Sequence, residues 1–251
     1  MPAETLDYLG VRLTRLTALE MIDEIKLREA QQRTLTVSCL CFHVVNIIRA
    51  NKNIERFFRS LDVVTPGGIA ILWTSWLFGR PLTRRNQLDI EALAPLLYTE
   101  AVGRGWGIYF LGGAPGIASV AADKLREAFP GLRVVGTHHG YLNSLEENQA
   151  VIDEINRSGA TIVLVGMGQP LQEEWMVANK PRVRAAALIA VGAYFSHVIR
   201  HVHCYPAWVY KWRVHWLYRL LREPRRLWKR YTLGFLTFCM RILWGRVVGT
   251  R

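Results

Sequence analysis

The sequence predicts an α/β fold: a Rossmann-like, mostly parallel sheet with flanking helices, plus a basic, Trp-rich helical C-terminal appendage. Two observations predict it. Apolar runs typical of strands buried on both faces alternate with helical patterns over most of the chain. The net positive charge is concentrated at the C-terminal end, since residues 200–251 hold 12 of the 32 Lys and Arg and a single acid, Glu223. We therefore expect a Rossmann-like domain over residues 1–200 and an appendage over residues 201–251.

The strand-like runs are short and rich in Val, Ile and Leu. They lie at residues 34–42, 107–112, 132–136, 161–166 and 186–192. Cys39 and Cys41 fall two residues apart in the first run, so we expect both thiols on one face of a strand, buried and reduced. This pattern is typical of parallel strands covered by helices on both faces.

Between the strands, the apolar spacing predicts amphipathic helices. The pattern over residues 146–159 ends at Gly159, a residue type that favours a left-handed C-cap. Over residues 117–129, one predicted face carries Val120, Ala121, Leu125 and Ala128.

Composition narrows the class of protein. Hydrophobic residues make up 51% of the chain, which excludes disorder. No run of 18 uncharged apolar residues occurs, so we expect no ordinary transmembrane helix. The N-terminus has no basic region followed by an apolar core, so we expect no signal peptide and a cytosolic chain.

The loops that follow the strand-like runs are the candidate ligand sites, because ligands of parallel sheets bind at the carboxyl ends of strands. In FLGGAPG, Gly112 and Gly113 would let the backbone approach an anionic group. A helix is expected to begin at Pro115, with its N-terminus facing the same place. The alternative is a tight strand-to-helix turn that simply needs small residues.

The loop VGMGQPLQEEW repeats this design, with Gly168 near the strand end and Pro170 expected to open a helix. Gln172 and Glu173 are suited to hydrogen bonding a sugar or ribose, although Glu173 is equally suited to capping the helix.

A third loop places His138, His139 and Tyr141 after a strand. A histidine in such a loop is more often a hydrogen-bonded surface residue than a ligand. No His, Asp or Glu cluster of the sequence shows metal-ligand spacing, so we expect no metal and no other cofactor.

Taken in order, four stretches resemble one family. FLGGAPGIASVAADKLREAFPGLRVVGTHHGYL, VLVGMGQPLQEEW, VGAYFSHV and HWLYRLLREPRRLWKRY resemble the WecG/TagA/CpsF family of bacterial glycosyltransferases, glycosyltransferase family 26, from about residue 8 to about residue 235. The resemblance implies inverting, metal-independent transfer of a sugar from a UDP-sugar to a polyprenyl-diphosphate-linked saccharide. It places this reaction at the cytoplasmic face of the bacterial inner membrane, in exopolysaccharide, capsule or cell-wall biosynthesis. The donor-binding residues it implies are Gly112, Gly113, His139, Tyr141, Gly168, Gln169, Pro170, Gln172 and Glu173.

The sequence departs from the family at the proposed general base. Where the family reads T-P-D-G, this chain reads TPGG, with Gly67 in place of the aspartate. Arg84 and Asp89 of RRNQLDI are kept, and His43 stands where the family has an asparagine near the end of the first core strand. Our catalytic candidates are therefore His43, Asp89 and Arg84.

Other roles stay open for these residues. Asp89 is also suited to capping the helix that follows it, and His43 to an ordinary polar position at a strand end. The diphosphate of the acceptor could itself take the proton, or the chain could be a non-catalytic relative that binds a nucleotide sugar or a partner enzyme.

The sequence of the C-terminal segment predicts that it binds a membrane surface. Tryptophan recurs at every fourth position, as Trp208, Trp212 and Trp216, which forms one stripe on a helix. Glu223–Pro224 is expected to break this helix, and Trp228 follows the break. Trp beside many cations favours the interface of an anionic membrane, although the same stripe could pack on the domain. We expect some of the cations to neutralise the diphosphate of the acceptor: Arg219, Arg222, Arg225 and Arg226.

A basic nucleic-acid-binding protein is the function of a different class that would use the same cations. The sequence has no nucleic-acid-binding motif, so we expect no nucleic-acid partner. A homo-oligomer is possible.

Overall fold

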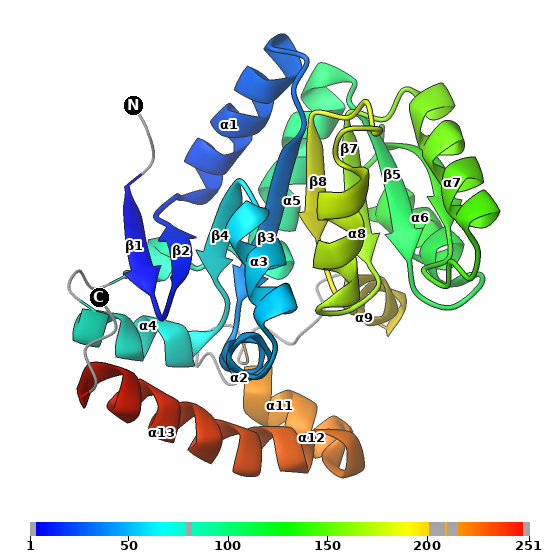
Figure 1. Ribbon diagram of the computed structural model, residues 1–251. Coiled ribbons are helices and arrows are strands. Elements are labelled where there is room, and N and C mark those ends of the chain that lie inside the picture. The colour runs from blue at the N-terminus through cyan, green and yellow to red at the C-terminus, as the bar shows by residue number, and fades with distance from the viewer. Residues whose placement is uncertain (1–3, 79–81, 201–208, 210–214, 248–251) are drawn as a thin grey trace.

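Six parallel strands form the centre of the computed structural model, which describes residues 4–78, 82–200, 209 and 215–247 (Figure 1). Their spatial order is β4-β3-β8-β7-β5-β6, and every pairing in this sheet is parallel. The strands are β3 (Leu35–Leu40), β4 (Val63–Pro66), β5 (Gly107–Gly112), β6 (Arg133–His138), β7 (Ile162–Gly166) and β8 (Ala187–Ala190). The predicted Rossmann-like parallel sheet is confirmed.

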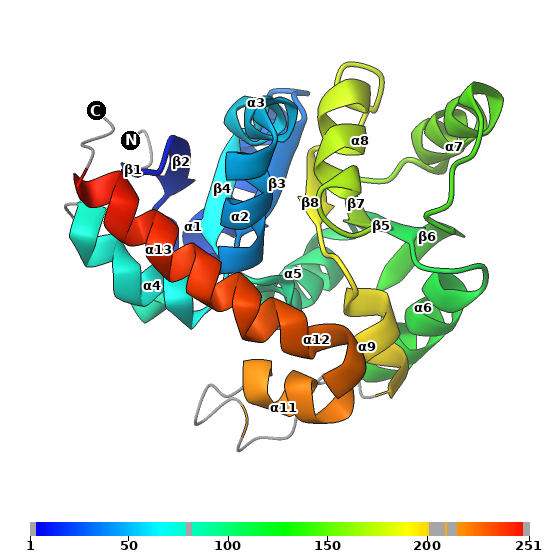
Figure 2. The ribbon, with the colours of Figure 1, turned by 60° about the horizontal axis from the view of Figure 1, so that its bottom comes forward.

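Helices cover both faces of the sheet (Figures 1 and 2). Side chains of one set share a core with the first face: α1 (Ala18–Ala30), α5 (Ile90–Arg104), α6 (Ile117–Ala128) and α9 (Tyr194–Arg200). The second set shares a core with the opposite face: α2 (Phe42–Ala50), α3 (Lys52–Ser60), α4 (Ile69–Ser75), α7 (Leu145–Ser158) and α8 (Leu171–Asn179). Both faces of the strands are therefore buried, as their apolar runs require.

Several elements differ from the predictions. The first strand ends at Leu40, and Cys41 lies at the N-cap of α2, so Cys39 and Cys41 do not share a strand. The four-residue strand β4 and the antiparallel hairpin of β1 (Thr5–Tyr8) and β2 (Val11–Thr14) were not predicted. These strands are too short to give a periodic signal. Short 3-10 turns, η1 (Trp76–Phe78) and η2 (Arg84–Asn86), follow α4.

The C-terminal end of α7 agrees with the prediction, whereas α6 buries a different face from the predicted one. α7 ends at Gly159, whose φ of +66° confirms the left-handed C-cap. α6 buries Ala118, Ala121, Ala122 and Leu125, whereas Val120 is 45% exposed and Ala128 is exposed too. The predicted face was therefore rotated. Three alanines on the true face let the helix lie close to the sheet.

The C-terminal segment forms three helices, α11 (His215–Arg222), α12 (Pro224–Tyr231) and α13 (Leu233–Val247), and the predicted break at Glu223–Pro224 is where α11 ends. α13 lies across α2 (Figure 2), where its Phe238 and Ile242 are fully buried in the second core. Asn46 of α2 donates to the Gly234 carbonyl at 2.7 Å, which fixes the start of α13. This helix is consequently part of the packed domain.

Candidate active site

The carboxyl ends of the six strands meet at one edge of the sheet, and there the chain leaves neighbouring strands toward opposite faces. β5 is followed by α6, which packs in the first core, whereas β7 is followed by α8, which packs in the second. In open α/β sheets, the crevice in which ligands bind is expected at such a switch of direction, beyond the strand ends. Gly112 of β5 and Gly166 of β7 are paired at this point.

Glycine is required at the ends of both strands, because their backbones are in close contact here. A Cβ on Gly112 would come within 2.5 Å of the Gly166 backbone, and a Cβ on Gly113, whose φ is +73°, would lie 2.7 Å from Ile117 Cγ2. The Gly113 amide donates to the Gly166 carbonyl at 3.1 Å, and the Gly140 amide donates to the Gly113 carbonyl at 2.9 Å. Three loops are thereby held together at the strand ends.

This arrangement changes which backbone amides are available to bind the expected anionic group. The Gly113 amide donates to Gly166 and the Ile117 amide to the Ala114 carbonyl, so an anion would rely on the next amides of the first turn of α6, those of Ala118 and Ser119. That helix begins at Ile117 after Gly116 as N-cap, so the predicted start at Pro115 was two residues early. The positive end of the α6 dipole still points at the crevice.

The loop after β7 folds its polar side chains inward. Gly168 has φ +81°, and α8 begins at Leu171 with Pro170 at the N-cap position, one residue later than predicted. Gln169 Nε2 donates to the Cys39 carbonyl at 2.9 Å, and Gln172 Oε1 accepts from the Gly192 amide at 3.0 Å. These amides join the ends of β3, β7 and β8.

Glu173 is a fully buried carboxyl group. Its Oε1 accepts from Ser38 Oγ at 2.6 Å, from Gln172 Nε2 at 2.9 Å and from Gln169 Nε2 at 3.2 Å. Its Oε2 is buried and has no hydrogen-bond partner among the described residues. Burial raises the pKa of Glu173, and the three donors oppose that rise. Glu173 therefore links α8 to β3 and does not cap its own helix.

Gly67, at the predicted base position, is closely packed. Its amide donates to the Leu40 carbonyl at 2.8 Å. A Cβ there would lie 3.1 Å from Cys39 Sγ, 3.2 Å from Cys39 Cβ and 3.3 Å from the Leu40 carbonyl oxygen. Burial raises the pKa of the Cys39 thiol well above its usual value, so this group stays protonated. Cys39 occupies space that a larger residue at position 67 would need.

Asp89 lies near Cys39, the side chain that borders Gly67. The fully buried Thr65 hydroxyl donates to the Leu88 carbonyl at 3.0 Å and ties the residue before Asp89 to the end of β4. Asp89 is also close enough to Cys39 to disfavour its thiolate. The Asp89 side chain caps α5, because its Oδ1 accepts from the Ala92 amide at 3.0 Å. The capping role that we left open is thus observed, and Oδ2 of the same carboxylate accepts from Gln87 Nε2 at 3.3 Å.

His43 lies in the first turn of α2 and not at a strand end. Burial, with the charge of Arg230 as the second cause, lowers the pKa of His43 to about 4. A side chain that holds a proton so weakly is a poor proton acceptor at neutral pH. Arg84 lies in the η2 turn, and its side chain falls outside the described part of the chain.

Arg230 of α12 is the tail cation that reaches the strand ends, and the sequence analysis missed it. Its Nη2 donates to Cys41 Sγ at 3.6 Å, and its Nε is buried with no hydrogen-bond partner among the described residues. The contact depends on Phe42, which packs on Tyr231 at a ring distance of 5.8 Å and on Phe235 at the same distance. No local pattern distinguishes Arg230 from its basic neighbours.

The structure describes the side chains of only some of the predicted arginines and tryptophans of the tail. Arg222 donates to Tyr218 at 3.0 Å and Arg225 is exposed, while the side chains of Arg219 and Arg226 lie outside the described residues. Trp216 and Trp228 are about half exposed, at 45% and 46%, and Trp208 and Trp212 lie outside the described residues.

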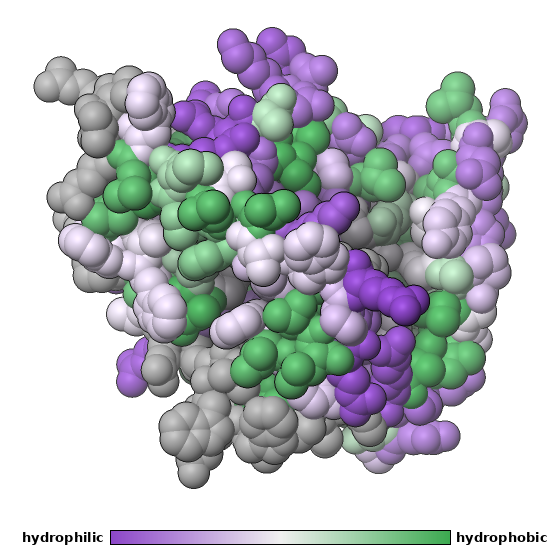
Figure 3. Space-filling model, turned by 90° about the horizontal axis from the view of Figure 1, so that it is seen from below, coloured by the Kyte–Doolittle hydropathy of each residue, from purple (hydrophilic) through white to green (hydrophobic). Residues whose placement is uncertain are grey.

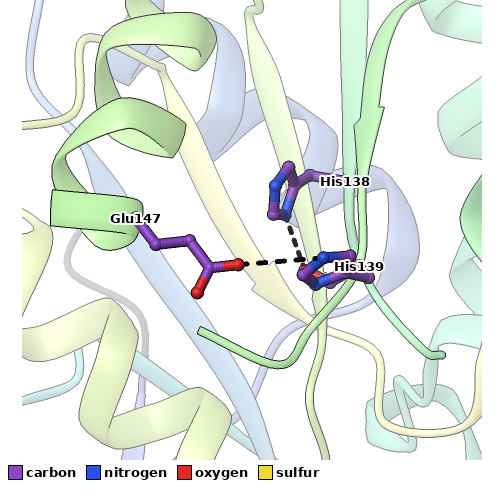
Figure 4. Close-up of side chains that lie close together, drawn as sticks. All are labelled: His138, His139 and Glu147. Carbon is purple, nitrogen blue, oxygen red and sulfur yellow. Dashed lines mark hydrogen bonds and ion pairs between the residues drawn. The ribbon is translucent and has the colours of Figure 1, made fainter. Parts of the chain in front are cut away.

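The loop after β6 brings three potential metal ligands together (Figure 4). One ring nitrogen each of His138 and His139 and one carboxylate oxygen of Glu147 all lie within 4.8 Å of one another. Our expectation that the chain forms no such cluster was wrong, because Glu147 approaches from the next helix. Tyr141, in the same loop, is exposed.

A cavity of about 770 Å³ lies at the opposite edge of the sheet, beside the strand starts at Thr34, Thr161 and Ala186. Its basic residues, among them Arg28 and Lys180, stand beside the C-termini of α1 and α8, where cations complement the helix dipoles. It therefore does not belong to the crevice.

Comparison with known proteins agrees with this geometry. A model of the glycosyl transferase WecG/TagA/CpsF family matches residues 6–251. An N-acetylglucosaminyldiphosphoundecaprenol N-acetyl-beta-D-mannosaminyltransferase of Bacillus spizizenii is 28% identical over 72% of this chain and 68% of its own length. The enzyme of that name from Staphylococcus aureus strain MW2 is 24% identical over 88% of this chain and 86% of its own. A UDP-Gal:alpha-D-GlcNAc-diphosphoundecaprenol beta-1,4-galactosyltransferase of Shigella boydii is 24% identical over 73% and 76%. With a match that spans nearly its whole length, the chain belongs to the WecG/TagA/CpsF family of glycosyltransferases.

Proposed function

We propose that the protein transfers a sugar, with inversion and without a metal, from a UDP-sugar to a polyprenyl-diphosphate-linked saccharide. The observation that carries this proposal is the pair of closely packed glycines where β5 and β7 turn to opposite faces, with the α6 N-terminus following β5, in a chain of this family. The relatives named above act on N-acetylglucosaminyl-diphosphoundecaprenol. Backbone amides and a helix dipole suit the diphosphate of a nucleotide sugar.

We assign the general base to Asp89. Inverting attack needs a group that accepts the proton of the acceptor hydroxyl, and glycine at position 67 cannot do so. Asp89 is a carboxylate close to Cys39, whose side chain lies against Gly67, and the Thr65–Leu88 hydrogen bond ties the preceding residue to β4, whereas the lowered pKa of His43 disfavours the imidazole. Arg230 supplies positive charge for a diphosphate at the same strand ends.

The acceptor is anchored in lipid, and we propose that the tail binds the cytoplasmic face of the bacterial inner membrane. α13 is apolar on two sides: Phe238 and Ile242 are buried on α2, whereas Leu236, Leu243 and Trp244 are 58%, 64% and 68% exposed. Figures 1 and 2 both place α4 next to α13, where Trp73 and Trp76 are also exposed. No helix among the described residues is long and apolar enough to cross a membrane.

Apolar side chains gather on this face of the molecule, with hydrophilic ones beside them (Figure 3). Exposed Trp and Leu next to cations such as Arg225 and Lys229 match the chemistry of an anionic headgroup layer. An apolar face this exposed is costly in water, which supports a lipid partner.

The transfer reaction tests the function directly. Purified protein is incubated with a synthetic N-acetylglucosaminyl-diphosphate-polyprenol and a panel of UDP-sugars, and the product is detected by mass spectrometry. A donor that reacts should also raise the melting temperature, equally with and without EDTA. If no UDP-sugar stabilises the protein, or if stabilisation requires a divalent metal, the proposed donor site is wrong.

Liposome flotation tests the membrane surface. The variant Leu236→Ser/Leu243→Ser/Trp244→Ser should float far less with anionic liposomes than the parent, and high salt should weaken the parent only partly. A matched control, Leu19→Ser/Leu145→Ser, removes exposed leucines of α1 and α7 and should float normally. Equal flotation of both variants would reject the surface, and retardation of nucleic acid without flotation would favour the alternative partner.

A second candidate is a non-catalytic relative that binds the nucleotide sugar, and Gly67 is the observation that favours it. The two candidates separate cleanly. Thermal stabilisation by a UDP-sugar without product, over the full donor panel, supports the binding protein, whereas turnover supports the transferase.

A further inference from the structure

The group formed by His138, His139 and Glu147 has a use that the transfer reaction does not require. His138 and His139 end β6 and begin its loop, and Glu147 lies in the first turn of α7 (Figure 4). We propose that these three side chains bind one divalent transition-metal ion, Zn²⁺ being the best match. Two imidazoles and one carboxylate are a common set of protein ligands for zinc, with a fourth position left for water.

Glu147 is held by its helix in an orientation suited to a ligand. The Ser144 hydroxyl accepts from the Glu147 amide at 3.1 Å, and Glu147 Oε2 accepts from the Asn143 amide at 2.7 Å. This reciprocal capping arrangement uses one carboxylate oxygen and leaves the other, Oε1, 3.7 Å from His139 Nε2. A ligand whose second oxygen is fixed by an outer hydrogen bond is typical of metal sites.

His138 is oriented in a similar way. Its Nδ1 lies 2.9 Å from the His139 carbonyl, which can only accept, so Nδ1 carries the proton. Nε2 then keeps its lone pair for a ligand. A backbone carbonyl that fixes the tautomer of a ligating histidine is the usual outer-sphere arrangement.

His139 is half-buried, and one of its ring nitrogens lacks a partner among the described residues. Its Nδ1 is buried with no hydrogen bond among the described residues, and the 3.7 Å from its Nε2 to Glu147 is too long for a hydrogen bond. An unsatisfied buried ring nitrogen is destabilising, and a bound ion would remove part of that cost.

The ligand atoms are slightly farther apart than in a tetrahedral zinc site, so the side chains would have to move a little closer together. Zinc bonds of about 2.1 Å in a tetrahedron place ligand atoms about 3.4 Å apart. The atoms here lie within 4.8 Å, so the side chains need to move inward by roughly 1 Å or less each.

The ion would fix the loop that borders the crevice. Gly140 follows His139 directly, and its amide donates to the Gly113 carbonyl at 2.9 Å. Binding of one ion by β6 and α7 therefore holds this loop against the strand end of β5. We assign the ion a structural role outside the transfer step, and its binding is measured without any sugar donor, so failure of the zinc site and failure of the donor site can be told apart.

Calorimetric titration of the chelator-stripped full chain with ZnCl₂ tests the site. The parent should bind one equivalent with micromolar affinity or better, and Co²⁺ should give a tetrahedral visible spectrum without a thiolate band. Glu147→Gln and His138→Gln should each weaken binding at least tenfold. The glutamine side chain in Glu147→Gln keeps an oxygen for the Asn143 amide, so the metal-free melting temperature of this variant should stay close to the parent value.

Two controls separate this site from adventitious binding. His197→Gln disrupts the other His–carboxylate pair, in which His197 Nδ1 lies 3.1 Å from Glu91 Oε1, and His201→Gln/His203→Gln removes the closely spaced histidines of the tail. Both should bind like the parent. The proposal is overturned if the parent binds no zinc, if Glu147→Gln and His138→Gln bind as tightly as the parent, or if either control loses the affinity instead.

Discussion

Replacing Gly67 with aspartate should destabilise the protein through crowding alone. The backbone of Gly67 is not in the left-handed region, so an aspartate meets no conformational barrier there. Space is the obstacle, because its Cβ would lie 3.1 Å from Cys39 Sγ, 3.2 Å from Cys39 Cβ and 3.3 Å from the Leu40 carbonyl oxygen. All three contacts are shorter than ordinary van der Waals separation.

The expected loss for Gly67→Asp is about 1–3 kcal/mol of unfolding free energy, the usual cost of overpacking. For a chain of this size that corresponds to a melting temperature lower by roughly 2–12 °C. Cys39→Ala removes the sulfur, the nearest of the three contacts, and leaves the other two. The double variant should therefore recover about 1 kcal/mol relative to the sum of the single variants.

A double-mutant cycle by urea unfolding measures this coupling. Gly68→Asp is the matched control: a Cβ there meets nothing within 4 Å, but its φ of +89° is strained for any other residue, so Cys39→Ala should not rescue it. Additive free energies for Gly67→Asp and Cys39→Ala would refute the crowding argument. If the double variant also gains transfer activity that the parent lacks, Gly67 explains a lost base.

Three further outcomes follow from the site. Asp89→Asn should lower the transfer rate by about 10²-fold or more while the melting temperature hardly changes, because an asparagine caps α5 as well as aspartate does; unchanged turnover would remove Asp89 as the base. His43→Asn should reduce the stability lost on acidification, measured by urea unfolding at pH 7 and pH 5. The pKa of His43 is lowered to about 4 by burial, so between pH 6.5 and 4 the unfolded chain takes up a proton that the folded chain refuses, and the parent loses stability as pH falls. Arg230→Gln should raise the KM for the lipid-linked acceptor, whereas Arg222→Gln, whose side chain bonds Tyr218, should not; equal effects would count against Arg230 as the phosphate ligand.

The sequence was sufficient to predict the sheet strands other than β4, and the glycine loops, because these depend on local patterns. Apolar runs of five to nine residues identify buried parallel strands, and Gly112 and Gly159 are needed for close approach and for a left-handed cap. The net positive charge of the tail could likewise be predicted directly from its composition. These local features do not depend on contacts with distant parts of the chain.

Contacts between distant segments could not be predicted in the same way. The strand-like run continued to residue 42, yet the chain turns into α2 after Leu40, because Phe42 is needed in the packing against α13. Glu147 joins His138 and His139 because a helix cap turns its carboxylate toward them, and spacing along the chain gives no sign of it. The stability of α13 on α2 likewise depends on the tertiary partner.

The tail connects two roles that the sequence presented as separate. Phe42 and Asn46 of α2 hold α12 and α13 as one unit, so the segment that carries Arg230 to the strand ends also carries the exposed apolar face of α13. If that face lies in the headgroup layer, the same segment brings the guanidinium close to the depth at which a polyprenyl diphosphate leaves the lipid. A diphosphate in the lipid surface can then meet Arg230 and Asp89 without leaving its membrane, which explains why a basic, tryptophan-rich helix is packed into the domain and not tethered to it.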